Sequence, residues 1–152
     1  MKKLILIVLI ICFLGVAQVQ AKWWIFGQSE DIVELNYLYV NGISFDDIDD
    51  EVILSTESLE SGMVRVHGKA SAGRNKIGKV SVSIDGGQTW RTSEMAKDGA
   101  FEYRFDAETG RSYKMRVKAM DTTGKSNEPE DTAFELTVTD ESMMEQVEQT
   151  LA

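Results

Sequence analysis

Few side chains in this sequence of 152 residues have the type and spacing that catalysis requires. The single histidine, His67, lies between Val66 and Gly68 and has neither a cysteine nor a second histidine at metal-ligand spacing. The only cysteine is Cys12, which falls in an apolar run. No glycine-rich phosphate-binding loop is recognisable, and the carboxylates are numerous without forming an acid–base pair. The sequence therefore predicts a protein that is not an enzyme, with no catalytic residue and no cofactor.

One stretch of the sequence is dense in carboxylates. Between positions 46 and 51 the acidic residues are Asp46, Asp47, Asp49, Asp50 and Glu51. Clustered oxygen ligands can bind calcium weakly in extracellular modules, so the four aspartates are a weak calcium candidate. The stretch lacks the alternating ligands and the central glycine of a loop-type calcium site, which favours a solvated acidic linker without a metal.

The segment SIDGGQTW, from Ser83 to Trp90, contains the most specific motif of the chain. It matches the Ser-x-Asp-x-Gly-x-Thr-Trp turn of sialidase-type propellers, but a propeller repeats its motif from blade to blade and this sequence has it once. The other interpretation is a structural hairpin turn. In that turn Asp85 accepts hydrogen bonds from nearby amides, Gly86 and Gly87 adopt positive φ, and Trp90 folds back on the sheet. We favour the structural interpretation.

The segments around this turn alternate between apolar and polar residues from Met63 onward, which is the pattern of half-buried β-strands. The polar positions, such as Ser81 and Ser83, are expected to face solvent. Turn residues separate the segments, and the only proline, Pro129, falls in the last loop. Because each segment has one apolar face, we expect two packed sheets in an all-β, immunoglobulin-like antiparallel β-sandwich. The apolar sets are Val64/Val66, Val80/Val82/Ile84, Phe101/Tyr103/Phe105, Tyr113/Met115/Val117/Ala119 and Phe134/Leu136/Val138.

We assign residues 51–139 to this sandwich and residues 22–50 to an N-terminal extension. The extension contains a hairpin signal at Asn41-Gly42, followed by the acidic stretch. Residues 140–152 change to helical periodicity and begin with a capping box. A short C-terminal amphipathic helix is predicted there, and its apolar face consists of Met143, Val147 and Leu151.

Residues 1–21 have the pattern of a cleavable secretory signal peptide. A basic start precedes the apolar run Leu4–Ala17, which is shorter than the ~20 residues of a spanning helix, and residues 19–21 fit a peptidase site. Cleavage after Ala21 would deliver the chain to the periplasm of a Gram-negative-type bacterium or to its exterior. The alternative is an uncleaved inner-membrane anchor, because Trp23 and Trp24 suit a membrane interface.

The charge of the chain restricts its partners. The sequence carries 16 basic and 25 acidic residues, a net charge of −9, and the loss of Lys2 and Lys3 with the leader would bring this to −11. Such a protein disfavours nucleic acid and anionic membranes as general partners. Because Cys12 would also be lost, no disulfide remains, and stability must come from the core.

Three sets of residues are candidates for contact with another protein of unknown identity. The first opens the expected mature chain, and it either caps the sandwich or docks on a protein or a bilayer. The second is a basic stripe on one expected strand, where we favour pairing across the sheet; immunoglobulin-like order would place this strand between those of Ser81 and Glu135. The third is the apolar face of the C-terminal helix. In order, the sets are Trp23, Trp24 and Phe26; Lys114, Arg116 and Lys118; and Met143, Val147 and Leu151.

Three stretches resemble known modules: VRVHGKASAGRNKIGKVSVSIDGGQTW, GAFEYRF and YKMRVKAMDTTGKSNEP. Over about Val52–Val138 the chain resembles the bacterial immunoglobulin-like modules of secreted and cell-surface proteins. Gly68–Trp90 is also similar to the immunoglobulin-like dimerisation domain that follows the molybdenum domain in sulfite-oxidase-type enzymes. The resemblance implies a fold and not a reaction, because this fold carries many roles and the cysteine ligand of the molybdenum domain has no counterpart here.

The sequence thus indicates a non-enzymatic, exported immunoglobulin-like module for protein binding or assembly in the periplasm or at the cell surface. The alternative is a carbohydrate-binding or enzyme-accessory β-sandwich module. That alternative predicts exposed aromatic rings in a row on one sheet or at loop tips.

Overall fold

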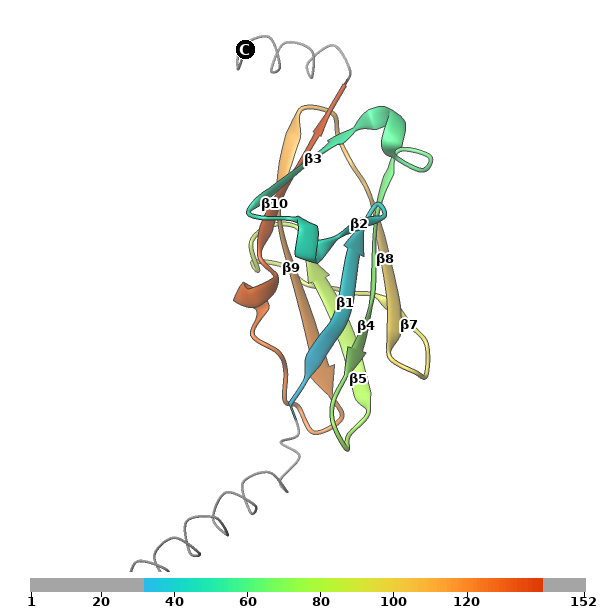
Figure 1. Ribbon diagram of the computed structural model, residues 1–152, viewed down its shortest axis with the longest axis vertical. Helices are drawn as coiled ribbons and strands as arrows, with labels where there is room; N and C mark the ends of the chain where they lie inside the picture. The colour runs from blue at the N-terminus through green and yellow to red at the C-terminus, as the bar shows by residue number, and fades with distance from the viewer. Residues whose placement is uncertain (1–31, 141–152) are drawn as a thin grey trace, which may run out of the picture. The chain divides into compact units, whose positions relative to one another are not determined.

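Two β-sheets packed face to face make up the part of the protein that the computed structural model describes, residues 32–140 (Figure 1). The first sheet has the order β2 (Ile43–Ser44), β1 (Glu34–Val40), β4 (Met63–Ser71), β8 (Ala100–Asp106) and β7 (Glu94–Met95). The second has the order β3 (Glu51–Ser55), β10 (Phe134–Thr139), β9 (Arg111–Asp121), β5 (Ile77–Ser83) and β6 (Arg91–Thr92). Neighbouring strands are antiparallel except β3 and β10, which are parallel. The predicted all-β, immunoglobulin-like sandwich is confirmed.

Three short 3-10 turns connect strands of these sheets: η1 (Phe45–Asp47), η2 (Thr56–Ser58) and η3 (Pro129–Thr132). Within residues 32–140 the structure has no helix that is long and apolar enough to cross a membrane. The predicted C-terminal helix, beyond residue 140, lies outside the described residues.

The core lies between the sheets and follows from the alternation in the sequence. In β4 and β9 every second residue is buried, from Val64 to Ala70 and from Tyr113 to Asp121. Phe101, Val117 and Leu136 come from both sheets and belong to one hydrophobic cluster. Burying a large apolar side chain contributes about 1.5–3 kcal/mol, so the shared cluster is what holds the two layers together.

The sandwich begins earlier in the chain than residue 51, which corrects the predicted boundary. The hairpin of β1 and β2 turns at Asn41 and Gly42, as expected, with φ of 48° and 84°. However, β1 also pairs with β4 from Glu34 to Val40, so the hairpin is an integral part of the first sheet. The short alternating run revealed the hairpin but could not reveal its long-range partner strand, because pairing across a sheet leaves no local sequence signal.

A second difference concerns the serines of β5. Ser81 and Ser83 were expected to face solvent, but they are only 5% and 1% exposed. The turn that follows β5 engages Ser83, whereas Ser81 pairs with Thr92 of β6 and Lys118 of β9. The Ser83 hydroxyl accepts a hydrogen bond from the Gly87 amide (2.8 Å) and donates to Asp85 Oδ1 (2.7 Å). Both faces of β5 are therefore covered at its C-terminal end.

Two glycines with similar φ have different surroundings and form a matched pair. Gly99 has φ 85°, and a Cβ at this position would clash with the carbonyl oxygen of Ala70. Gly110 has φ 77°, and a Cβ there would meet nothing within 4 Å.

We expect Gly110→Ala to cost about 1–2 kcal/mol, the strain of an L-residue at positive φ. Gly99→Ala should cost about 4 kcal/mol or more, because the same strain is combined with a clash against backbone that cannot move aside. Urea unfolding of both variants measures the difference. Equal costs would show that β4 and the turn before β8 are not held as close together as described.

Candidate interaction surfaces

The Asp85 turn is held together by hydrogen bonds of its own side chains. Asp85 Oδ1 accepts a hydrogen bond from the Thr89 amide (2.8 Å), and Oδ2 accepts one from the Thr89 hydroxyl (2.5 Å). These bonds from Thr89, together with the bond from Ser83, lower the pKa of Asp85 to about 2. Gly86 and Gly87 have φ of 73° and 91°, as expected for this turn. Its side-chain polar atoms are engaged within the turn, and the Gly86 amide donates to Lys114 O of β9, which agrees with the structural interpretation of the motif.

Asp121 organises a second turn in the same way at the end of β9. Its carboxylate accepts hydrogen bonds from the Thr123 amide and hydroxyl, the Lys125 amide and the Asn75 side chain. Burial raises the pKa of this carboxyl, but these hydrogen bonds outweigh burial and lower the pKa to about 2. The two turns hold opposite ends of β9 against neighbouring loops, since Gly86 donates to Lys114 O (2.9 Å) near the other end.

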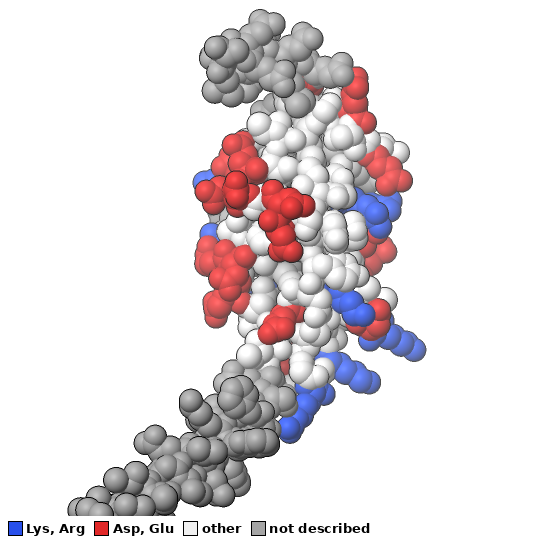
Figure 2. Space-filling model, in the orientation of Figure 1, with Lys and Arg blue, Asp and Glu red and all other residues white. Residues whose placement is uncertain are grey.

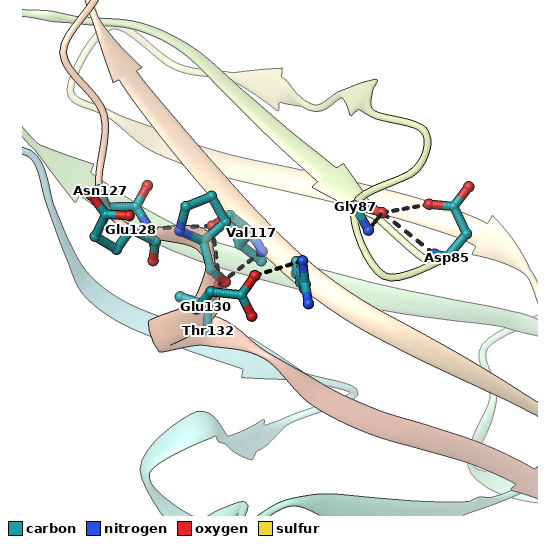
Figure 3. Close-up of polar contacts among 10 residues, drawn as sticks. Asp85, Gly87, Val117, Asn127, Glu128, Glu130 and Thr132 are labelled. Atoms are coloured by element: carbon teal, nitrogen blue, oxygen red, sulfur yellow. Dashed lines mark hydrogen bonds and ion pairs between the residues drawn. The ribbon is translucent and has the colours of Figure 1, made fainter.

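The basic stripe lies where it was expected, on β9 between β5 and β10. Its members have neighbours within the domain. Arg116 Nη1 forms an ion pair with Glu130 Oε1 at 2.7 Å (Figure 3). Lys118 Nζ lies 6.0 Å from the centre of the Trp90 ring, and Lys114 packs against Gly86. Because Arg116 and Lys118 are engaged by the domain itself, the geometry gives no support to this stripe as a partner site.

The acidic stretch does not form a metal site in the structure. Asp46 and Asp47 lie in η1, and Asp49 and Asp50 precede β3, all with exposed side chains. Within residues 32–140 no three acidic, histidine or cysteine side chains come close enough together to hold a metal ion. The structure therefore does not bring the weak calcium candidates together.

The remaining sequence candidates lie outside the described residues. These are Trp23, Trp24 and Phe26 near the start of the chain, and Met143, Val147 and Leu151 near its end. Their roles stay predictions.

The outer face of the first sheet carries an aromatic row that we did not single out from the sequence. Tyr37 and Tyr39 of β1 meet edge to face, with ring centroids 5.9 Å apart. Tyr39 stacks on His67 of β4 at 5.3 Å with an interplanar angle of 13°. The signal was present in ELNYLYV, where alternation places both tyrosines on the same side of a strand. Tyr37 is 44% exposed and forms the accessible end of the row.

Charged side chains continue this face across β4 and β8. Arg65 donates to Glu102 Oε2 through Nε (2.8 Å) and Nη2 (2.5 Å), and Arg104 Nε lies 2.7 Å from Glu102 Oε1. The bond from Arg65 is the main cause of a lowered pKa at Glu102. Burial, and then the positive charge of Arg65, lower the pKa of His67. We call this surface the tyrosine face: Tyr37, Tyr39, Arg65, His67, Glu102 and Arg104.

A groove of about 540 Å³ runs along the beginning of β1. One wall consists of residues 32–38, and the other is formed by Phe45, Asp46, residues 126–128 and residues 131–132 at the end of η3. Ile32 is 48% exposed at its mouth. Figure 2 shows acidic side chains crowding the left of the molecular face around η1, η3 and β3, whereas lysines and arginines gather at the lower right. We call this feature the β1 groove.

The far wall of the groove is held to β9 by side chains that make the backbone hydrogen bonds a neighbouring strand would otherwise make (Figure 3). Thr132 Oγ1 accepts a hydrogen bond from the Val117 amide (2.9 Å) and lies 3.0 Å from the Val117 carbonyl oxygen. Asn127 Oδ1 accepts from the Ala119 amide (2.8 Å), and its Nδ2 donates to Val117 O (3.2 Å). Pro129 has no amide to offer a ladder, which explains why this segment is a wall and not a strand.

These observations define the class of protein: an immunoglobulin-like β-sandwich in which acidic turns are structural and the open surfaces are a sheet face and a groove. Residues 33–148 match the family described as the Mo-co oxidoreductase dimerisation domain. The chain belongs to this family. The match extends the resemblance seen in Gly68–Trp90 over most of the chain, and it includes β1, in agreement with the corrected boundary.

Solved structures similar to the chain include the sulfane dehydrogenase SoxCD from Paracoccus pantotrophus and the fibronectin(III)-like modules of Clostridium thermocellum CbhA. The first is 27% identical, with a TM-score of 0.38, over 46% of this chain and 19% of that chain. The second is 18% identical, with a TM-score of 0.47, over 72% of this chain and 98% of that chain. The chain thus spans less than a fifth of SoxCD. No curated protein matches it.

The lowered pKa values of Asp85 and Asp121 predict how the stability of the fold depends on pH. Their pKa values of about 2 lie below the usual 3.8, so the unfolded chain takes up protons first as the pH falls. This contribution is complete above about pH 4 and is lost between about pH 4 and pH 2. Asp121→Asn should lower the urea concentration at the unfolding midpoint at pH 7. Between about pH 4 and pH 2 this midpoint should then fall less steeply than in the unsubstituted chain.

Asp106→Asn is the matched control, because Asp106 is exposed at the end of β8. It should keep the acid dependence of the unsubstituted chain. If Asp121→Asn showed that same dependence, the hydrogen bonds to Asp121 would not be the cause.

Proposed function

We propose that this chain is an exported, non-enzymatic module that associates with another protein in the bacterial periplasm or at the cell surface. The observation that carries the proposal is the family match over residues 33–148, because the family is described as a dimerisation domain. The signal-peptide pattern of residues 1–21 supports export. A second copy of the chain is the first partner to test.

The tyrosine face offers the composition that protein interfaces favour. Tyrosine and arginine are enriched in interfaces and among the residues that dominate binding energy. Arg65 and Arg104 lie on either side of Glu102, so the face carries both signs of charge. Self-association through a two-fold axis requires a surface that is complementary to itself, and a face of mixed charge around an exposed tyrosine meets that requirement.

Expression with the native leader in a Gram-negative host should place the chain in the periplasmic fraction, with a mass that corresponds to a start at Lys22.

Sedimentation velocity of that periplasmic material should show self-association that strengthens with concentration. Tyr37→Ala should weaken it about tenfold or more, as expected for an aromatic anchor at an interface.

Ile53→Ala is the matched control, because Ile53 is 46% exposed on β3 in the other sheet. It should leave association unchanged, and thermal melts should show that both variants are folded. A chain that remains monomeric at the highest concentration tested would contradict self-association, and equal effects of the two substitutions would contradict the assignment to the tyrosine face.

Carbohydrate binding is a second candidate, because Tyr37, Tyr39 and His67 form the kind of aromatic row that it predicts. One face of the Tyr39 ring is already covered by His67, so Tyr37 is the ring available for stacking on a sugar. A glycan array should then show binding that Tyr37→Ala abolishes. An array without hits would remove this candidate.

A further inference from the structure

The β1 groove combines an apolar lining with an open strand edge. Ile32, Leu35 and Phe45 contribute apolar side chains to it. In the described part of the chain, β2 covers the free edge of β1 only at Tyr39 and Val40, which leaves the edge of residues 34–38 without a neighbouring strand. An open edge presents backbone donors and acceptors that another extended chain can pair with.

The charges around the groove all have one sign. Glu34, Asp46, Glu128 and Asp131 line it, and among residues 32–140 no lysine or arginine does so. All four side chains are exposed, and none of them takes part in the ion pairs found in the described residues. By contrast, Glu102 on the tyrosine face and Glu130, which belongs to η3 but does not line the groove, are paired with arginines. The groove therefore holds an uncompensated negative charge beside apolar surface.

We propose that the β1 groove binds an extended cationic segment of a partner protein, which adds as a strand to the edge of residues 34–38. Its lysine or arginine side chains would meet the four carboxylates, and its alternate apolar side chains would enter the groove. This inference rests on the proposed function in protein association and names the chemistry of one partner.

Other occupants fit these observations less well. A second copy of the chain would bring the same four carboxylates to the groove of its partner, and like charges at close range oppose contact. Nucleic acid and anionic membranes are repelled for the same reason. The acidic rim thus protects the open edge from copies of the chain while leaving it accessible to a basic segment.

The groove is preformed, which favours binding. Its far wall is held to β9 by the Thr132 and Asn127 side chains, and its near wall is a strand paired to β4. Little of the protein has to be ordered when the segment enters, so less of the interaction energy is lost to conformational entropy.

The test uses the exported chain and a fluorescein-labelled peptide of seven alternating lysine and valine residues, about 23 Å when extended. Fluorescence anisotropy should show binding that weakens with salt. When the peptide is added to isotope-labelled protein, the changes in amide chemical shift in the NMR spectrum should concentrate in residues 34–38 and 126–132. Two peptides serve as controls: alternating glutamate and valine reverses the charge, and N-methylation of alternate amides removes strand pairing. Both should bind at least about tenfold more weakly.

A charge variant tests the groove itself. Replacing its four carboxylates by amides (Glu34→Gln, Asp46→Asn, Glu128→Gln and Asp131→Asn) should weaken the peptide about tenfold or more, because exposed pairs contribute modestly but add up. The matched control replaces four exposed carboxylates outside the groove lining: Glu57→Gln, Glu60→Gln, Glu94→Gln and Asp106→Asn. It has the same net charge and should bind like the unsubstituted chain.

Equal binding by the two charge variants would overturn the proposal, as would equal binding of the lysine and glutamate peptides or amide shifts away from β1. Sedimentation of the same samples without peptide reports separately on self-association. A chain that self-associates but does not distinguish the peptides would refute the groove alone, whereas a chain that binds the peptide in the groove but stays monomeric would refute only the second copy as partner.

Discussion

The polar groups along β9 constrain the rest of the sandwich, because this strand of 11 residues lies in the middle of the second sheet and each of its backbone amides and carbonyls needs a partner. β5 runs along one side of it from Ile77 to Ser83. On the other side β10 pairs only as far as Met115, and beyond that point Thr132 and Asn127 provide the bonds that a strand would have made. The chain from Asn127 to Thr132 therefore does not join the sheet as a strand, and it borders the β1 groove instead.

Local patterns predicted those parts of the structure that depend on local chemistry. The alternation in β4, β5, β8, β9 and β10 indicated which residues face the core, and the aspartates and glycines after β5 and β9 indicated turns that are present. The order of the strands around the basic stripe was also correct, because the immunoglobulin-like arrangement follows from the resemblance.

The parts that were missed all depend on contacts between segments far apart in the chain. The pairing of β1 with β4 moved the boundary of the sandwich from residue 51 to the hairpin. Ser81 and Ser83 are buried, and the turn after β5 forms hydrogen bonds with the Ser83 hydroxyl. For Arg116 pairing across the sheet was expected, but its ion-pair partner is Glu130 of η3, which is not part of a strand. The β1 groove has walls from opposite ends of the described chain, so neither wall contains a motif that indicates the other.

The chain enters β1 at one end of the sandwich and leaves β10 at the opposite end, with both strands running in the same direction (Figure 1). β9, which spans 11 residues at about 3.3 Å each, is about 35 Å long. Tension applied through the two ends would therefore pull β1 lengthwise against β4 and β10 lengthwise against β9, loading whole ladders of hydrogen bonds in shear instead of opening them one at a time. Shear of this kind is opposed by all the hydrogen bonds of a ladder at once, so the direction of the two strands favours resistance to extension between these ends.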